Sequence, residues 1–289
     1  MNSDSLQKHY NSPIIVYTCI LGGFDNLRPP LVPPEPGVRF ICFTDVPVLP
    51  DVPPWEFRPA HRIMDGYSAD GSSWGYNHSR TSRLPKILPH LVLPADCDYS
   101  IWLDGNLRLL KPASEIINTE MRFDDWAAHR HPARGCMYEE AELLQRLKKE
   151  SPDEWPNMDA RELDAEIERY RAMGFPEKLN TLSANGIIIR KHTTDVARLN
   201  ERWWQLFAQG CGRDQLSLPV ARWNSPVTVN RMPHYPDIYS SPLARFGWHA
   251  AWKDKPDNVQ YRPERERIAA RVAKLREVVG DGGYGWLQP

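Results

Sequence analysis

An uninterrupted apolar run near the start of the chain limits the folds that the chain can adopt. Residues 13–20 read Pro-Ile-Ile-Val-Tyr-Thr-Cys-Ile, without the alternation of apolar and polar positions that marks a half-exposed strand. A strand of this kind is covered on both faces, as the parallel strands of α/β proteins are. The run therefore predicts a strand in a sheet that helices flank on both sides.

Two later predicted strands end in a carboxylate. Residues 38–45 end at Asp45, and the run Ser-Ile-Trp-Leu-Asp-Gly-Asn over residues 100–106 carries Asp104 and Asn106. Burying an unpaired charge is costly, so such residues are expected where a strand emerges at a ligand site. A hard cation with phosphate oxygens is a common partner there. A plain turn is the alternative, because Asp-Gly-Asn is also good turn chemistry.

The composition excludes several classes of protein. A chain of 289 residues forms one large or two small domains, and 36 Lys and Arg against 37 Asp and Glu give a net charge near zero, which does not suggest a nucleic-acid binder. No apolar run is long enough for a transmembrane segment, and the polar residues 1–12 lack the apolar centre of a signal peptide. The five scattered cysteines predict reduced thiols in a cytoplasmic protein rather than a zinc knuckle.

A helix is predicted over residues 77–90, and it carries three cationic side chains. Arg80, Arg83 and Lys86 recur at i, i+3 and i+6, which keeps them roughly on one flank. Pro85 is expected to kink or shorten this helix. The pattern leaves two interpretations open, a solvated basic face and a site for an anion.

Two longer segments are predicted from composition and periodicity. Residues 46–73 are rich in Pro, Gly and Asp and are expected to form a long surface loop. Residues 139–174 combine many charges with regularly spaced apolar positions, which predicts two amphipathic helices separated by a break at residues 151–152.

Several motifs occur in an order typical of one family. The short motifs are Phe-Thr-Asp at 43–45, Trp-Leu-Asp-Gly-Asn at 102–106, Asn-Gly-Ile-Ile-Ile at 185–189 and Arg-Asp-Gln-Leu-Ser at 213–217. A longer motif, HxxRxCxYEEA, occupies residues 131–141. Through these motifs the chain, from Ile14 to Lys253, resembles the bacterial and plant glycosyltransferase-like domain family of the TOD/MUCI type. Through that family it is distantly similar to the glycogenin type of sugar-nucleotide transferase with the GT-A fold.

The resemblance implies a fold and a domain organisation. The expected fold is a single α/β domain of the GT-A-like type, with a mixed, mostly parallel central sheet flanked by helices. This domain is expected over residues 13–256, after an N-terminal tail of residues 1–12 and before a C-terminal helix and tail over residues 257–289.

The resemblance also implies roles for individual residues. Asp104 and Asn106 stand where such enzymes carry the Asp-x-Asp that holds Mn²⁺ or Mg²⁺ against the donor diphosphate, and His249 matches a further metal ligand. Because Asn106 replaces the second Asp, one formal charge of attraction for the cation is lost. The residues implied for donor binding are Asp45, Arg83, Lys86, Asp104, Asn185, Gly186 and Lys253, and those implied at the reacting sugar are Asp214 and Gln215.

The activity implied is transfer of a sugar from a nucleotide-diphosphate donor, with a UDP-sugar as the expected donor, to a saccharide, lipid-linked or other hydroxyl acceptor. A pathway that builds surface polysaccharide or glycoconjugate fits this activity. Peripheral contact with a membrane is compatible with it, and both a retaining and an inverting outcome stay open. The leaving diphosphate gains negative charge in such a reaction, so a divalent cation, or Lys and Arg in its place, would stabilise the transition state.

Two other classes of function stay open. A metal-dependent hydrolase would use Asp104, Asp214 and several histidines, but the pair His129 and His131 is only half of the ligand cluster that it needs. Their i, i+2 spacing places both on one face of a strand, where such pairs are more often structural. A catalytically idle nucleotide-sugar-binding module is the second class, because Asn stands in place of the second Asp.

Overall fold

The computed structural model describes residues 13–45, 51–60, 78–150, 160–233 and 241–246. Four of the features predicted from the sequence lie outside these residues: the N-terminal tail 1–12, the metal ligand His249, the cation Lys253 and the C-terminal helix and tail 257–289.

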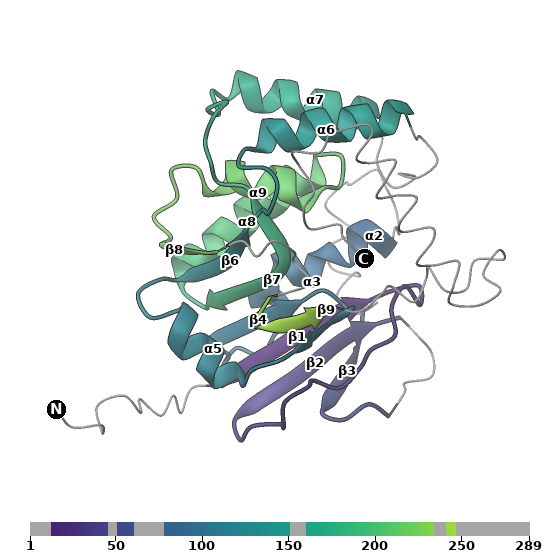
Figure 1. The fold of residues 1–289 in the computed structure, drawn as a ribbon, viewed down its shortest axis with the longest axis vertical. Helices are drawn as coiled ribbons and strands as arrows, with labels where there is room; N and C mark the ends of the chain where they lie inside the picture. The colour runs from purple at the N-terminus through teal and green to yellow at the C-terminus, as the bar shows by residue number, and fades with distance from the viewer. Residues whose placement is uncertain (1–12, 46–50, 61–77, 151–159, 234–240, 247–289) are drawn as a thin grey trace.

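A seven-stranded sheet forms the centre of the described chain (Figure 1). Its strand order is β3-β2-β1-β4-β7-β6-β8, and four of its six pairings are parallel. Its strands are β1 (Ile14–Ile20), β2 (Val38–Thr44), β3 (Trp55–Pro59), β4 (Tyr99–Leu103), β6 (Trp126–Arg130), β7 (Ser183–Lys191) and β8 (Val229–Met232). A small antiparallel sheet pairs β5 (Leu107–Leu109) with β9 (Ala244–Phe246). The predicted mixed, mostly parallel sheet is confirmed, and the strands before Asp45 and Asp104 share one sheet.

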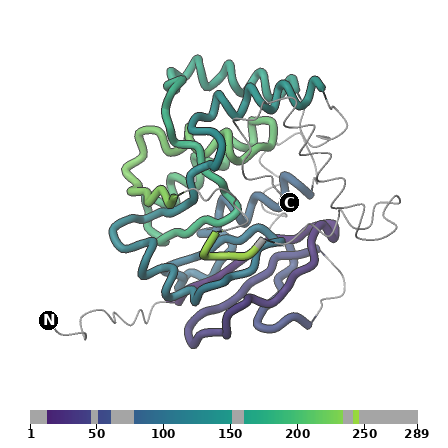
Figure 2. Tube along the Cα trace, viewed as in Figure 1, coloured from purple at the N-terminus to yellow at the C-terminus, as the bar shows by residue number. Residues whose placement is uncertain are grey.

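Helices flank this sheet, as the fold class requires. They are α2 (His78–Thr81), α3 (Arg83–Ile87), α4 (Pro89–Val92), α5 (Ala113–Glu120), α6 (Met137–Glu150), α7 (Ala160–Ala172), α8 (Thr194–Ala208) and α9 (Asp214–Arg222). Helices α3 and α6 to α9 pack on one face, and α5 packs on the other together with the small sheet. Helices α6 and α7 lie side by side, and α9 lies between this pair and the sheet (Figures 1 and 2).

The apolar run that begins the fold is buried on both faces. All seven residues of β1 are buried, and alternate side chains enter different cores. Ile15 and Tyr17 pack with the larger helical layer, whereas Ile14 and Val16 pack with α5 and the small sheet. Burial of each such side chain contributes about 1.5–3 kcal/mol, so β1 anchors both layers.

The predicted loop over residues 46–73 is wrong in one part. Within it, β3 forms a parallel edge strand beside β2, and its Trp55 is buried against Phe40 with ring centroids 5.2 Å apart. The Trp55 indole N–H donates to the Arg28 carbonyl at 3.0 Å. Trp-Glu-Phe-Arg alternates apolar and polar residues as an edge strand does, but the surrounding prolines outweighed this short signal in the sequence.

The single helix predicted over residues 77–90 is also wrong, because the described part of this segment forms the three short helices α2, α3 and α4. Pro89 begins α4, where its missing N–H has no helical partner to lose, and Pro85 lies early in α3. The two helices predicted over residues 139–174 are confirmed by α6 and α7, with residues 151–159 between them outside the described chain.

Candidate active site

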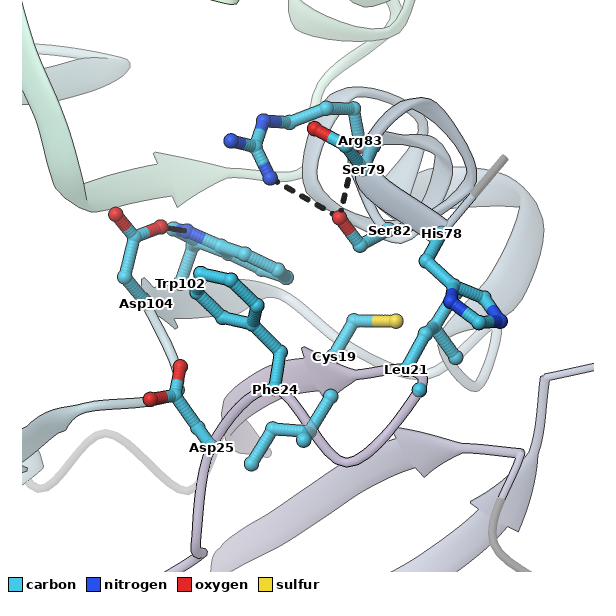
Figure 3. Close-up of a pocket in the computed structure, with 13 residues that line it drawn as sticks. Cys19, Leu21, Phe24, Asp25, His78, Ser79, Ser82, Arg83, Trp102 and Asp104 are labelled. Atoms are coloured by element: carbon cyan, nitrogen blue, oxygen red, sulfur yellow. Dashed lines mark hydrogen bonds between the residues drawn. The ribbon is translucent and has the colours of Figure 1, made fainter. Parts of the chain in front are cut away.

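A cavity of about 550 Å³ opens at the carboxyl ends of β1 and β4, beside helices α2 and α3 (Figure 3). In open α/β sheets, ligands bind at this edge of the strands. The residues that line the cavity are Cys19, Ile20, Leu21, Gly22, Phe24, Asp25, His78, Ser79, Ser82, Arg83, Trp102, Asp104 and Gly105. The lining therefore combines an aromatic and apolar wall with charged groups, as a pocket for a nucleotide would.

The rim of the cavity is a glycine turn that Asp45 holds in place. The Gly22 N–H donates to both carboxylate oxygens of Asp45, at 2.9 and 3.1 Å. The φ angles of Gly22 and Gly23 are 63° and 64°, in the left-handed region that favours glycine. A Cβ on Gly22 would also lie 2.4 Å from Nδ1 of His78. Asp45 thus lies beside the cavity and fixes its rim, and its predicted contact with the nucleotide stays a prediction.

A buried ammonium joins two of the predicted site residues. The Lys86 Nζ lies 3.2 Å from Oδ1 of Asp104 and 2.9 Å from Oδ2 of Asp214, and the Lys86 side chain is only 2% exposed. Arg83 approaches the same Asp214 carboxylate from α3, with Nε 3.6 Å from Oδ1. We call Arg83, Lys86, Asp104, Asn185 and Asp214 the cavity cluster.

The cationic side chains of this segment do not form a solvated face. Lys86 and Arg80 are buried, and Arg80 forms an ion pair with Glu162 at the start of α7. Only Arg83 of the three lines the cavity. Arg83 and Lys86 thus share the Asp214 carboxylate, whereas Arg80 pairs with Glu162.

Asp104 lines the cavity, as Arg83 of the same cluster does. Its Oδ1 accepts a hydrogen bond from the Trp102 indole N–H at 2.8 Å, and its side chain remains 38% exposed. Trp102 precedes Asp104 by two residues, so both side chains point to the same face of β4. No role was predicted for Trp102, although its i, i+2 spacing from Asp104 is visible in the sequence.

Asp214 is buried and surrounded by donors. It is the first residue of α9, and Asn185 Nδ2 donates to its Oδ2 at 3.3 Å. Burial alone would raise the pKa of the Asp214 carboxyl, but the charges of Lys86 and Arg83 outweigh burial and hold that pKa well below its usual value. A carboxylate that stays ionised can face a cationic sugar carbon or accept hydroxyl hydrogen bonds, but it is a weak general base.

The remaining predicted residues of the reacting face lie around Asp214. Gln215 follows it in α9, and its Nε2 donates to the Ser183 carbonyl at 3.4 Å while its Oε1 accepts from Arg213 at 3.1 Å. Asn185 and Gly186 lie in β7 itself rather than in a loop before it. The backbone carbonyl of Gly186 accepts from the Asp104 N–H at 2.9 Å. The structure thus joins Asp104, Asn185, Gly186 and Asp214 through hydrogen bonds and Lys86.

Of the described residues implied as metal ligands, Asp104 is placed to bind a hard cation in the cavity, and Asn106 is not. The side-chain donors Lys86 and Trp102 both contact Oδ1 of Asp104, and the Asp104 side chain is 38% exposed. Oxygen of this kind suits Mn²⁺ or Mg²⁺. Asn106 is buried, 7% exposed, and does not line the cavity. Within the described ranges, no three His, Cys, Asp or Glu side chains gather as a metal would need.

The histidine pair has structural partners. His129 contacts the Pro233 carbonyl through Nδ1 at 2.9 Å and the Ser241 hydroxyl through Nε2 at 3.2 Å. His131 accepts the Arg134 N–H at its Nδ1, 3.1 Å away. Both rings of this pair therefore have partners within the fold, so His129 and His131 do not supply the ligands that a metal-dependent hydrolase would need.

The longer motif forms a second group of buried charges. Glu140 is 3% exposed, forms an ion pair with Arg134, and lies 3.7 Å from Arg213 and 4.0 Å from His131 Nε2. We call these four residues the helix cluster. Burial lowers the pKa of His131 to about 4, which keeps the ring neutral near pH 7. Arg213 links this cluster to Gln215.

The fold defines an α/β protein of the GT-A-like class, with a cavity at the carboxyl ends of its strands. The model of the TOD1/MUCI70, glycosyltransferase-like domain matches residues 73–234, which is more than half of the chain. The chain therefore belongs to the TOD1/MUCI70 glycosyltransferase-like domain family. None of the curated proteins compared with the chain matches it in sequence.

Three solved structures are remotely similar to the chain. Mouse xyloside xylosyltransferase 1, in its apo form, shares 11% identity at a TM-score of 0.44, over 76% of this chain and 84% of that one. The apo bifunctional glycosyltransferase WbbM shares 10% at 0.44, over 76% of this chain and 38% of that one. The galactosyltransferase LgtC with donor and acceptor sugar analogues shares 9% at 0.43, over 90% and 95%. The family assignment rests on the family model.

Proposed function

We propose that this chain transfers a sugar from a nucleoside-diphosphate donor, with UDP-sugars as the first candidates, to a hydroxyl acceptor. The observation that supports this most directly is the cavity at the carboxyl ends of β1 and β4, in which Asp104 connects the lining to the buried Lys86–Asp214 pair. A donor in the cavity would thus have its sugar beside Asp214.

The nucleotide part of the donor would occupy the aromatic end of the cavity. Phe24 is 45% exposed and offers a flat face there, and aromatic side chains bind rings through stacking and burial. Arg83 would face the diphosphate, because it lines the cavity and its guanidinium can donate to phosphate oxygens. The donor roles of Asp45 and of Lys253, which lies outside the described residues, belong to the same proposal.

The leaving diphosphate gains negative charge as the glycosidic bond breaks. A bound Mn²⁺ or Mg²⁺ would neutralise that charge, and Asp104 is the residue of this chain that would hold it. Lys86 would hold the Asp104 and Asp214 carboxylates in fixed positions, because its ammonium contacts both. Such fixed charges stabilise a transition state without reorganisation.

The sugar would lie against Asp214, Asn185 and Gln215. The Asp214 carboxylate would stabilise the cationic sugar carbon, and the two amides would orient sugar hydroxyls. Because the pKa of Asp214 is held well below its usual value, this carboxylate is poorly suited to be the general base of an inverting enzyme. That property supports a retaining outcome.

The acceptor and the cellular context are further parts of this proposal. A saccharide or a lipid-linked hydroxyl in polysaccharide or glycoconjugate synthesis would suit the reaction. Among the described residues, no helix has the length and apolar character to cross a membrane. The cytoplasmic location predicted from the cysteines stays a prediction.

Calorimetric titration with UDP, GDP, CDP and ADP, followed by product analysis with nucleotide sugars and a set of saccharide acceptors, tests the proposal. Binding of one diphosphate together with transfer of its sugar supports a transferase. Binding without transfer to any acceptor indicates a binding module, and cleavage without nucleotide preference indicates a hydrolase. Absence of binding by all four diphosphates would contradict the proposal.

A further inference from the structure

Two arginines lie opposite each other on the outer face of the small sheet. Arg108 is in β5 and Arg245 is in β9, and the antiparallel register pairs these two residues directly. Leu107 and Leu109, on either side of Arg108, are buried, and side chains alternate along a strand, so Arg108 points away from that core. Residues directly opposite in such a pair have Cβ atoms about 4.5–5.5 Å apart. The two cationic side chains therefore lie side by side.

A third arginine, Arg28, comes from the segment that follows the glycine turn. The Arg108 Nε donates at 2.7 Å to the carbonyl of Pro29, the residue after Arg28. The Leu31 N–H donates to a β5 carbonyl at 2.9 Å, so this segment runs along β5. Burial, together with the charges of Arg28 and Arg245, lowers the pKa of Arg108, as expected for three neighbouring guanidinium groups. We call Arg28, Arg108 and Arg245 the arginine cluster.

The cluster costs the fold stability, because like charges directly opposite on neighbouring strands are destabilising. Among the residues that the structure describes, none of the three guanidinium groups forms an ion pair with a carboxylate. Arg28 and Arg245 are exposed, and the hydrogen bond of the Arg108 side chain uses Nε, which leaves its terminal nitrogens to a ligand. A bound anion would offset the repulsion that the described residues leave in place.

The cluster is close to the cavity along the chain but does not line it. Arg28 follows Asp25 by three residues and Arg108 follows Gly105 by three, and Asp25 and Gly105 both line the cavity. An anion at the cluster would therefore belong to a molecule other than the donor in the cavity. Guanidinium groups bind phosphate through paired, charge-assisted hydrogen bonds. Three positive charges suit a group with two or more negative charges better than a single carboxylate.

We propose that the arginine cluster binds the phosphate or diphosphate group of the acceptor while the donor occupies the cavity. The acceptors with this chemistry are phosphorylated saccharides and saccharides joined to a lipid through a diphosphate. The assignment to an acceptor rests on the proposed sugar transfer, whereas binding of the anion does not. The cluster would therefore hold the charged end of the acceptor and leave its hydroxyl free to reach the donor sugar.

Inorganic pyrophosphate is the probe for this site. It would be titrated calorimetrically into the full chain with EDTA present and at constant ionic strength, because salt screens exposed charges. We expect Arg245→Gln to weaken pyrophosphate binding about tenfold or more, since charge-assisted hydrogen bonds are lost. Arg245→Lys keeps the charge and should retain more affinity than Arg245→Gln. Arg198→Gln removes an exposed arginine from α8 and should leave the affinity unchanged.

Stability separates a ligand site from a structural contact. Because Arg245 lies opposite a like charge, Arg245→Gln should leave the urea midpoint of unfolding unchanged or raise it. Arg108→Gln also removes the hydrogen bond to Pro29, so Arg245→Gln is the decisive variant. A lower midpoint for Arg245→Gln, together with unchanged pyrophosphate affinity, would overturn the inference.

The location of the bound anion is tested against the cavity and against a membrane. Pyrophosphate binding that is lost in Arg83→Gln and retained in Arg245→Gln would place the anion in the cavity and overturn the inference. Vesicles of phosphatidylcholine, with and without phosphatidylglycerol, test a lipid headgroup. Binding to the anionic vesicles that Arg245→Gln abolishes, without binding of pyrophosphate, would assign the cluster to a membrane surface and overturn the acceptor site.

The inference and the proposed function fail in different ways. Pyrophosphate binding at the cluster, in a protein that binds no nucleoside diphosphate, would leave the anion site standing and overturn the proposed transfer. Sugar transfer by a protein that binds no pyrophosphate, with equal rates in the wild type and Arg245→Gln, would overturn the anion site alone.

Discussion

The chain buries two groups of charged side chains. They differ in whether any of the charged side chains line the cavity, where a ligand could contact them. In the helix cluster, the side chains of Glu140 and His131 are 4% and 7% exposed, and Glu140 is paired with Arg134 and Arg213, of which Arg213 is 31% exposed but does not line the cavity. In the cavity cluster, Lys86 and Asp214 are equally buried, but the Asp104 side chain is 38% exposed and lines the cavity. Both groups consist of residues from segments and motifs that the sequence analysis had singled out.

This difference teaches how to separate structural from functional charge. Burying ions costs free energy, so a closed cluster persists only because its members satisfy one another. The cavity cluster, whose Arg83 and Asp104 side chains line the cavity, retains capacity for a ligand. We therefore expect substitutions in the helix cluster to affect stability first, and substitutions in the cavity cluster to affect binding and turnover first.

The largest expected effect is that of Glu140→Gln, which leaves Arg134 and Arg213 without their buried carboxylate. The free energy of unfolding should fall by about 3–5 kcal/mol, as measured by urea unfolding. Nucleotide affinity of the folded fraction should not change. Glu142→Gln, an exposed neighbour in α6, is the control and should stay within about 0.5 kcal/mol of the wild type. A loss of nucleotide affinity with little loss of stability would contradict the assignment of this cluster.

Acid should destabilise the helix cluster through His131. Burial lowers the pKa of this ring to about 4, whereas the unfolded chain has an ordinary pKa near 6.5. Between these pH values the unfolded state binds more protons, so stability falls as the pH drops from about 6.5 to 4. The loss for one ring is about 1.4 kcal/mol per pH unit, or roughly 3 kcal/mol in all.

Comparison of the wild type with His131→Asn isolates this contribution from that of other titrating groups. His192, whose pKa burial also lowers to about 4, remains in both proteins. Unfolding free energies would be measured in urea at pH 6.5, 5.5 and 4.5. Identical slopes against pH in the two proteins would show that His131 is not the responsible ring.

Asp104→Ala should act on binding, in contrast to Glu140→Gln. Removal of the carboxylate is expected to weaken metal-supported nucleotide binding by about 1–3 kcal/mol, measured by calorimetry with Mn²⁺. Asp96→Ala removes an exposed carboxylate just before the opposite end of β4 and is the matched control. Unchanged affinity, both with and without a chelator, would place the metal site elsewhere or remove it from the proposal.

The smallest change in a functional free energy is expected for Asp214→Asn, measured on the folded fraction because Lys86 loses one of its two carboxylate partners. The substitution keeps the shape of the side chain, but the ionised group beside the sugar is lost. With a competent donor and acceptor, kcat should fall about tenfold or more, which is about 1.4 kcal/mol in the barrier, while nucleotide affinity is unchanged. Asp195→Asn, which changes an exposed carboxylate in α8, serves as the control. Equal turnover in the wild type and Asp214→Asn would reduce this residue to a structural role at the start of α9.

The strands that carry the site could be predicted from the sequence, because their signals are local. Continuous apolar runs identified β1, β2 and β4, and the acidic residues after them marked the edge at which the cavity opens. The edge strand β3 could not be recognised in the same way, because its alternation covers only a few residues between prolines. Its burial depends on Phe40 of β2, which is distant in the sequence.

The sequence by itself determined the fold class, the chemical types at the site and the motifs that identify the family. Only the tertiary structure decided which charges meet. Lys86 is one of three similar cations in a short segment, and its pairing with Asp104 and Asp214 arises because α3, β4 and α9 converge at one edge of the sheet. The arginine cluster had no distinguishing spacing, and it forms because β5 pairs with β9 and the segment after the glycine turn packs along β5. The distances between side chains on neighbouring elements are set by packing. The number of residues between them in the sequence does not reveal these distances.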